Sequence, residues 1–164
     1  MNNYLCQPKK SDKKAVALVS CLAATAMILF IFSIRFPGMK AILQLFTAAS
    51  LFFVVQISDR VLLRQYRYAF ENGDLILSTR QGPREKSLGG IPITAQTVIL
   101  DRKKWEEEKH KYLVSSRFSY CQNMFPRKPC YLLAPDEKGY MLLIFEPDET
   151  LLRLLNEQIK SLLK

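Results

Sequence analysis

Two long uncharged segments dominate the first third of the chain. Ala15–Ile34 holds twenty residues without a charge, and Ala41–Ile57 holds seventeen. A helix rises about 1.5 Å per residue, so the first segment would span about 30 Å, the thickness of the hydrocarbon layer of a bilayer. The second segment contains Gln44 and Gln56 and is close to the lower length limit for a span. The pattern predicts two transmembrane helices, at 15–34 and 41–57.

The connection between the two segments is short and ends the first helix. It contains Pro37-Gly38, a turn dipeptide that does not continue a helix. Two spans joined by so few residues must be antiparallel neighbours, which predicts a helical hairpin. The small residues expected to allow close packing of the two helices are Thr25, Ala26, Ala48, Ala49 and Ser50.

Beyond residue 58, alternation replaces the apolar runs. Tyr66, Tyr68 and Phe70 share one parity, which is typical of a half-buried strand, and the Asn72-Gly73 pair that follows is a strong hairpin signal. The later segments predicted as strands are 75–81, 84–88, 91–100, 112–120, 130–134 and 140–145. The run MLLIF in the last of them is apolar on both faces, so we expect it at the centre of the sheet.

The chain ends in a predicted amphipathic helix. Pro147 fits its first position, and Asp148 and Glu149 complement the positive end of the helix dipole. Its apolar stripe consists of Leu151, Leu152, Leu155, Ile159 and Leu162. We expect the stripe to pack against the sheet, and a partner-binding or membrane-binding helix is the alternative.

A highly charged segment, residues 101–111, separates two of the predicted strands. Its sequence DRKKWEEEKHK favours a solvated loop or a short helix. The alternative is a loop that contacts a membrane surface or a partner, with Trp105 as its anchor.

Basic residues predict the orientation of the hairpin. The chain has a formal net charge of +9. The basic residues beside the outer ends of the spans are Lys9, Lys10, Lys13, Lys14, Arg60, Arg64 and Arg67, whereas the connecting loop has only Arg35 and Lys40. Basic residues favour the cytoplasmic side, so both termini are expected in the cytoplasm of a multi-pass membrane protein. The predicted division is a basic tail at 1–14, the hairpin at 15–58 and a cytoplasmic domain at 59–164.

Two other interpretations of the N-terminal region predict a different location. The first is a cleaved signal peptide. It does not fit, because the twenty uncharged residues are longer than a signal-peptide core and a second predicted span follows them. Leu18-Val19-Ser20-Cys21 resembles the lipobox of bacterial lipoproteins, and lipidation of Cys21 would place the later domain outside the cell. The thirteen uncharged residues that follow Cys21 do not fit the polar tether of a lipoprotein.

Residues 64–163 resemble bacterial pleckstrin-homology-like (PH-like) domains. The opening YRYAFENGDLILSTRQG is similar to their first hairpin, and LIFEPDETLLRLLNEQI is similar to their last strand and capping helix. The resemblance implies an α+β domain with an antiparallel PH-like β-barrel of about seven strands, capped by the C-terminal helix. Such domains serve mainly as binding or scaffolding modules. The loop Glu71–Asp74 carries two acids and no base, unlike the basic loop with which PH domains bind phosphoinositides, so those ligand residues are not carried over.

No sequence motif indicates an enzyme or a cofactor. His110 is the only histidine and lies between two lysines, so it is expected to be solvated rather than catalytic. The chain has no G-x-S-x-G, no Walker loop, no G-x-G-x-x-G and no H-E-x-x-H.

The cysteines provide an alternative class of function. Cys121 and Cys130 flank a turn, so they are candidates for reversible oxidation or for part of a metal site, although buried thiols are the simpler interpretation. Cys6 is a candidate for palmitoylation. No catalytic, cofactor-binding or metal-binding residue is assigned.

The sequence therefore predicts a non-enzymatic binding or scaffolding module tethered to the lipid bilayer. Its partner is an unknown protein, and self-association stays open. Nucleic acid is not expected, because basic residues exceed acidic ones only by 18 to 14 after residue 58 and are dispersed. The alternative is a cysteine-based redox or metal-responsive membrane sensor.

Overall fold

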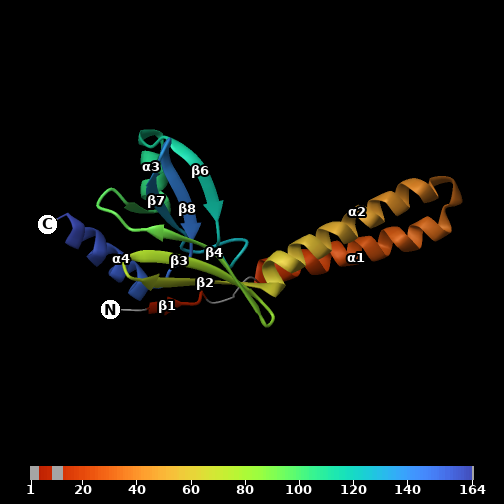
Figure 1. Cartoon of the computed structure of the whole chain (residues 1–164). Coiled ribbons are helices and arrows are strands. Elements are labelled where there is room, and N and C mark those ends of the chain that lie inside the picture. Colours follow the sequence, from red (N-terminus) through yellow and green to blue (C-terminus); the bar gives the residue numbers. More distant parts are fainter. Residues whose placement is uncertain (1–3, 9–12, 164) are drawn as a thin grey trace. The chain divides into compact units, whose positions relative to one another are not determined.

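In the computed structural model of the chain, which describes residues 4–8 and 13–163, two compact units are present. The first, named the hairpin, comprises residues 13–64. The second, named the sheet domain, combines residues 4–8 with residues 65–163. The sheet domain is therefore assembled from segments on both sides of the hairpin in the sequence (Figure 1).

The hairpin consists of two long antiparallel helices that lie side by side (Figure 1). Helix α1 covers Lys13–Arg35 and helix α2 covers Lys40–Ser58, with one 3-10 turn at Pro37–Met39 between them. Both helices are long and apolar enough to cross a membrane, so the two predicted apolar helices are confirmed. A single π-helical turn at Asp59–Leu63 follows α2.

The contact between α1 and α2 follows alternating spacings of four and three residues. Its fully buried positions are Ala15, Ala26 and Ser33 in α1 and Thr47 in α2. The half-buried positions that complete the spacing are Val19, Leu22 and Leu29 in α1 and Leu43, Ser50, Val54 and Ile57 in α2. This is the repeat of a coiled-coil seam. The predicted contact is wrong for Thr25, Ala48 and Ala49, which are exposed, because the 3.5-residue repeat and not side-chain size selects the contacting face.

The outer faces of the hairpin carry large apolar side chains. The exposed ones include Met27, Ile28, Phe30, Ile31 and Phe32 in α1 and Ile42, Leu45, Phe46, Phe52 and Phe53 in α2. In the seam, the hydroxyls of Ser33 and Thr47 donate to the carbonyl oxygens of Phe30 and Leu43, at 2.7 and 2.8 Å. Exposed apolar faces combined with internally satisfied polar groups are what a lipid environment requires.

The first sheet of the sheet domain has the order β1-β2-β3-β4. Its strands are β1 (Tyr4–Cys6), β2 (Arg64–Glu71), β3 (Asp74–Gln81) and β4 (Arg84–Pro92). Asn72 and Gly73 form the β2–β3 turn with φ angles of 54° and 90°, which are the left-handed values that a two-residue type I′ turn needs. The predicted opening hairpin is confirmed.

Strand β1 corrects the predicted N-terminal tail. Cys6 pairs with Tyr68 in an antiparallel ladder and is fully buried, so residues 4–6 belong to the sheet domain rather than to a separate tail at 1–14. Lys9 and Lys10 lie outside the described residues. The ladder also disfavours the lipoprotein interpretation, because cleavage before Cys21 would remove β1 from its sheet.

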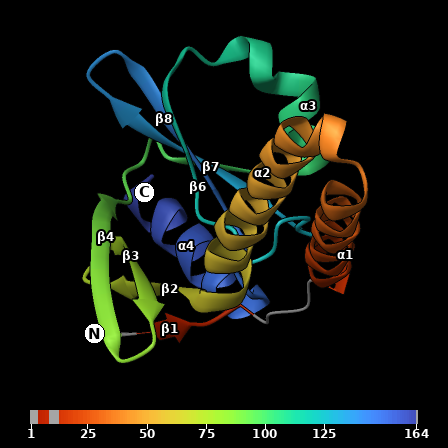
Figure 2. The ribbon, with the colours of Figure 1, turned by 90° about the vertical axis from the view of Figure 1, so that its right-hand side faces the viewer.

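The second sheet has the order β5-β7-β8-β6. Its strands are β5 (Val98–Asp101), β6 (Val114–Ser119), β7 (Cys130–Asp136) and β8 (Gly139–Phe145). β8 is an inner strand, as predicted for the MLLIF run, but it pairs with β6 in parallel, so an entirely antiparallel sheet is wrong. The sheet domain is an α+β unit with two separate sheets (Figure 2), and the described strands do not close into a barrel.

Two cores bury both faces of the second sheet. One core lies between the sheets and includes Tyr68, Leu75, Leu143 and Phe145 together with Leu155 of helix α4 (Glu149–Leu162). The other packs the opposite face of the second sheet against helix α3 (Arg102–Glu108). Coverage on both faces explains why β7 and β8 are apolar at successive positions.

Helix α4 starts at Glu149, two residues later than predicted. Pro147 precedes the cap, and Asp148 is the N-cap, whose carboxylate accepts a hydrogen bond from the Leu151 N–H at 2.8 Å. The second carboxylate oxygen of Asp148 accepts a hydrogen bond from the Tyr4 hydroxyl at 2.5 Å. Strand β1 and the last helix are thereby joined directly. The buried Leu151 and Leu155 confirm the predicted packing for the first part of the stripe, whereas Leu162 at its end is exposed.

The strand predicted at 91–100 is interrupted by a turn. The hydroxyl of Thr97 accepts a hydrogen bond from the Thr94 N–H at 3.0 Å, and the Thr97 N–H donates to the Thr94 carbonyl at 3.1 Å. These local bonds compete with a strand ladder, so β4 ends at Pro92 and β5 begins at Val98.

Candidate functional site

An apolar slot opens between the edge strands β4 and β6. It has a volume of about 200 Å³. The residues that line it are Leu77, Leu88, Gly89, Gly90, Ile91, Phe118, Tyr120, Met141 and Leu143. A volume of this size exceeds the ~30 Å³ of a water molecule several-fold but is smaller than the 300–1,000 Å³ of typical small-molecule pockets. We name this feature the β4–β6 slot.

A β-bulge in β4 shapes one wall of the slot. In the β3–β4 ladder Leu77 pairs with Gly89 and Ser78 pairs with Ser87, so the ladder skips Leu88. Gly89 has a φ of 145°, a conformation that is rare for residues with a side chain. Bulges of this kind redirect side chains and often lie beside functional sites. The sequence SLGG therefore forms the bulge that brings Leu88 into the lining of the slot.

The opposite wall of the slot is aromatic. Phe118 of β6 is 41% exposed, and its ring stacks on that of Tyr120 with a centroid distance of 6.2 Å. A large apolar ring kept at the surface beside a concave apolar slot is a common feature of binding surfaces.

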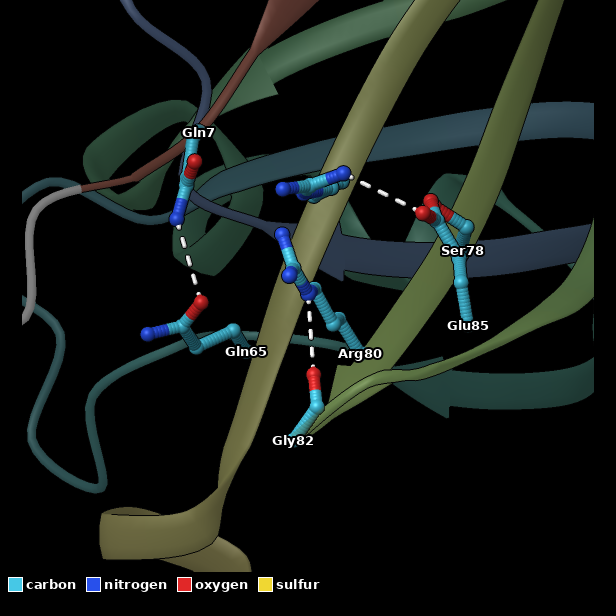
Figure 3. A network of polar contacts seen from close by, with 7 residues as sticks. Gln7, Gln65, Ser78, Arg80, Gly82 and Glu85 are labelled. Carbon is cyan, nitrogen blue, oxygen red and sulfur yellow. Dashed lines mark hydrogen bonds and ion pairs between the residues drawn. The ribbon is translucent and has the colours of Figure 1, made fainter.

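Polar contacts stabilise the strands that carry the slot (Figure 3). The Glu85 carboxylate on β4 accepts hydrogen bonds from the Ser78 hydroxyl at 2.9 Å and from the Arg67 guanidinium at 3.1 Å. At the β3–β4 turn the Arg80 guanidinium donates to the carbonyl oxygen of Gly82 at 2.9 Å. These contacts tie β2, β3 and β4 together and neutralise Glu85.

The free edge of β4 is consequently basic. Arg84 and Lys86 are both exposed and, two residues apart, share one side of the strand. Within residues 4–8 and 13–163 neither of them forms an ion pair. The edge of β4 thus offers unpaired backbone groups and two cations on the strand that also lines the apolar slot.

A second concavity of about 400 Å³ lies between α4 and the β2–β3 turn. It is lined by Phe70, Asn72, Gly73, Leu154, Glu157, Gln158 and Ser161. Its polar groups are amides, one hydroxyl and one carboxylate, a set without a nucleophile–base pair. The apolar lining of the β4–β6 slot is more distinctive.

The segment at 101–111 contains the short helix α3, which agrees with the favoured prediction of a solvated loop or a short helix. Asp101 caps α3 by accepting a hydrogen bond from the Lys104 N–H at 2.8 Å. Trp105 is buried, and its ring stacks on Tyr131 at 5.4 Å with an interplanar angle of 10°. The alternative role of Trp105 as a surface anchor is therefore wrong. His110 is exposed in a 3-10 turn at Lys109–Lys111.

The two candidate sensor cysteines pack into different cores. Cys121 is buried in the core beneath α3, whereas Cys130 is half-buried against the core between the sheets. All four cysteines are free thiols, and no cluster of metal-binding side chains occurs among the residues that the structure describes. The sensor function stays a prediction.

Burial changes the acidity of Cys130. Desolvation, assisted by the nearby Asp101 carboxylate, raises the pKa of its thiol from about 9 to about 11. The thiolate is the reactive form, so we expect the alkylation rate of Cys130 in the folded chain to keep rising with pH above 9. In the urea-denatured chain, the rate should reach half of its maximum near pH 9, compared with near pH 11 in the folded chain. Site-resolved mass spectrometry after brief iodoacetamide pulses measures both profiles.

The same pKa difference affects stability. The folded state disfavours the Cys130 thiolate. The contribution of Cys130 to the free energy of unfolding is therefore complete below pH 9, and it is lost as the pH rises from 9 towards 11. A folded-state alkylation profile with its midpoint near pH 9 would contradict the raised pKa.

Comparisons of the chain with protein-family models, curated proteins and solved structures find no match. Sequence reasoning missed the β4–β6 slot because its walls come from strands distant in sequence. The Gly89-Gly90 pair beside an alternating strand was its only local signal.

Proposed function

We propose that the chain is a membrane-tethered, non-enzymatic binding module. In this proposal the hairpin spans the bilayer, and the sheet domain binds an extended peptide segment of a membrane partner. The observation that carries the proposal is the β4–β6 slot, an apolar concavity between two edge strands. Anchoring would act by raising the local concentration of the sheet domain near its membrane partners.

The chemistry of the slot supports an extended peptide as its occupant. An edge strand presents unpaired N–H and C=O groups, with which an added strand can form a ladder. The slot beside it would take an apolar side chain of that strand. Arg84 and Lys86, on the same strand as the slot residues Leu88–Ile91, favour acidic residues in the same segment.

The proposed location is the cell membrane with both ends of the hairpin in the cytoplasm. The apolar outer faces of α1 and α2 support the membrane location. The orientation is supported by the excess of basic residues beside the outer ends of the helices over the two in the connecting loop. Because β1 and β2 pair in one sheet, residues 4–6 and 64–71 must lie on the same side of the membrane.

A relationship to PH-like domains is part of the proposal. It is supported by the antiparallel hairpins of the first sheet and by the amphipathic helix that closes the chain. The sheet domain differs from a closed PH-like barrel at the parallel β6–β8 pair and at the gap between β4 and β6.

The test uses a random peptide library displayed on phage and the full chain in lipid nanodiscs. Enriched peptides are expected to share an apolar residue flanked by Asp or Glu. Phe118→Ser should weaken binding of a selected peptide about tenfold or more, because a buried Phe contributes about 1.5–3 kcal/mol.

The matched control is Leu113→Ser, which removes another exposed apolar side chain outside the slot. It should leave the affinity unchanged. Arg84→Glu combined with Lys86→Glu should shift the selected peptides from acidic to basic. Equal losses for Phe118→Ser and Leu113→Ser, or enrichment without these features, would overturn the proposal.

A further inference from the structure

A second exposed apolar group lies in the segment between β6 and β7. Met124 and Phe125 are 38% and 53% exposed and are followed by the exposed cations Arg127 and Lys128. Pro126 lies between the apolar pair and the cations. We name residues 124–128 the MFPRK loop. Apolar side chains beside basic ones match the boundary of a lipid bilayer, where an apolar interior meets anionic head groups.

The base of the MFPRK loop is held firmly. The buried side-chain amide of Gln122 accepts a hydrogen bond from the Tyr66 N–H at 2.8 Å. The Glu146 carboxylate accepts hydrogen bonds from the Asn123 backbone N–H at 2.9 Å and from its side-chain amide at 3.1 Å. Exposure of the apolar tip is therefore a property of an ordered loop rather than of a frayed one.

These contacts attach the loop to one end of the first sheet. Tyr66 is two residues beyond Arg64, the last residue of the hairpin unit. At the same end, Gln7 after β1 donates to Gln65 of β2 at 3.3 Å (Figure 3). The MFPRK loop thus belongs to the end of the sheet domain through which the chain continues into the hairpin on both sides.

We propose that the MFPRK loop docks on the anionic bilayer that holds the hairpin. Met124 and Phe125 enter the boundary between head groups and acyl chains, while Arg127 and Lys128 contact anionic head groups. Docking fixes one orientation of the sheet domain at the membrane surface. This inference rests on the proposed membrane anchorage, and it assigns to Met124 and Phe125 the surface role that the buried Trp105 does not have.

The test places a fluorescent reporter in the loop of the full chain. The chain carrying Phe125→Trp is reconstituted in vesicles of phosphatidylcholine and phosphatidylglycerol with brominated acyl chains, which quench tryptophans that reach them. Relative to the wild-type chain, whose only tryptophan is the buried Trp105, the added emission should be blue-shifted and lost to bromine quenching.

The matched control is Leu113→Trp. Leu113 is 74% exposed and precedes β6, whereas the MFPRK loop follows it, so the control lies at the other end of that strand. Its emission should stay unquenched. Arg127→Gln combined with Lys128→Gln, added to Phe125→Trp, should reduce the ratio of docked to undocked chain by a factor of about five for each charge removed.

Flotation of the wild-type chain with vesicles after alkaline carbonate extraction separates the two proposals. Failure to float would overturn the membrane anchorage. Flotation combined with an unquenched Phe125→Trp would overturn bilayer docking alone and leave the MFPRK loop to a protein partner. Equal quenching of Phe125→Trp and Leu113→Trp would also overturn the proposed bilayer docking of the MFPRK loop.

Discussion

Replacing Phe145 with Ala is expected to lower the free energy of unfolding of the sheet domain by about 3–5 kcal/mol. Phe145 is fully buried in the core between the sheets. Its ring meets that of Tyr68 edge to face, with a centroid distance of 5.4 Å and an interplanar angle of 89°. Truncation would therefore leave a cavity among residues from both sheets and α4.

Trp105 provides the measurement. It is the only tryptophan, it is buried, and it stacks on Tyr131, so its fluorescence reports unfolding of the sheet domain. In a urea titration of the full chain in micelles, the midpoint should fall by about 2 M for Phe145→Ala. Leu113→Ala, at an exposed site, should shift stability by less than about 0.5 kcal/mol. An unchanged midpoint for Phe145→Ala would contradict the described core.

Gly38→Cys is expected to react with a membrane-impermeant maleimide on intact cells, whereas Ser161→Cys reacts only after permeabilisation. In the proposed orientation, which follows the positive-inside rule, the connecting loop lies outside and the sheet domain in the cytoplasm. A β-carbon at Gly38 would meet no atom within 4 Å, so the substitution leaves the turn undisturbed. Ser161 is exposed near the end of α4.

The wild-type chain supplies the background for this labelling. Cys6 and Cys121 are buried in the sheet domain, Cys130 is half-buried there, and Cys21 lies within α1. Labelling should rise from this background to near completion for each variant on its expected side. The reverse pattern, with Ser161→Cys labelled on intact cells, would show that the sheet domain is outside and would refute the proposed orientation.

Elements governed by local patterns were predictable from the sequence. The uncharged runs located α1 and α2 within a few residues, because helix length and hydrocarbon thickness are linked. Asn72-Gly73 located the β2–β3 turn, because few other pairs adopt two consecutive left-handed conformations. The start of α4 was not predicted correctly, because an Asp at this point in the sequence can lie within the first turn of a helix or precede it as the N-cap. Asp148 is the N-cap.

Elements governed by distant pairing were not predictable. Three residues of β1 carry too little alternation to be distinguished from a tail, and their partners lie more than sixty residues away. The parallel β6–β8 pair depends on the backbone of Gly139 approaching the Leu113 carbonyl so closely that no side chain would fit there. The β4–β6 slot and the base of the MFPRK loop likewise depend on contacts between separate elements.

The position of β1 before the hairpin makes completion of the first sheet depend on the proposed two-span insertion of the hairpin. All partners of β1, including Tyr68 and Asp148, are synthesised after the hairpin. In a copy that crossed the bilayer only once, residues 4–6 would lie on the opposite side of the membrane from β2, and the edge of β2 would stay unpaired. An open strand edge is a template for pairing with other chains and so favours aggregation. Under the proposed insertion, the first sheet is therefore complete only in a chain whose two helices both cross the bilayer.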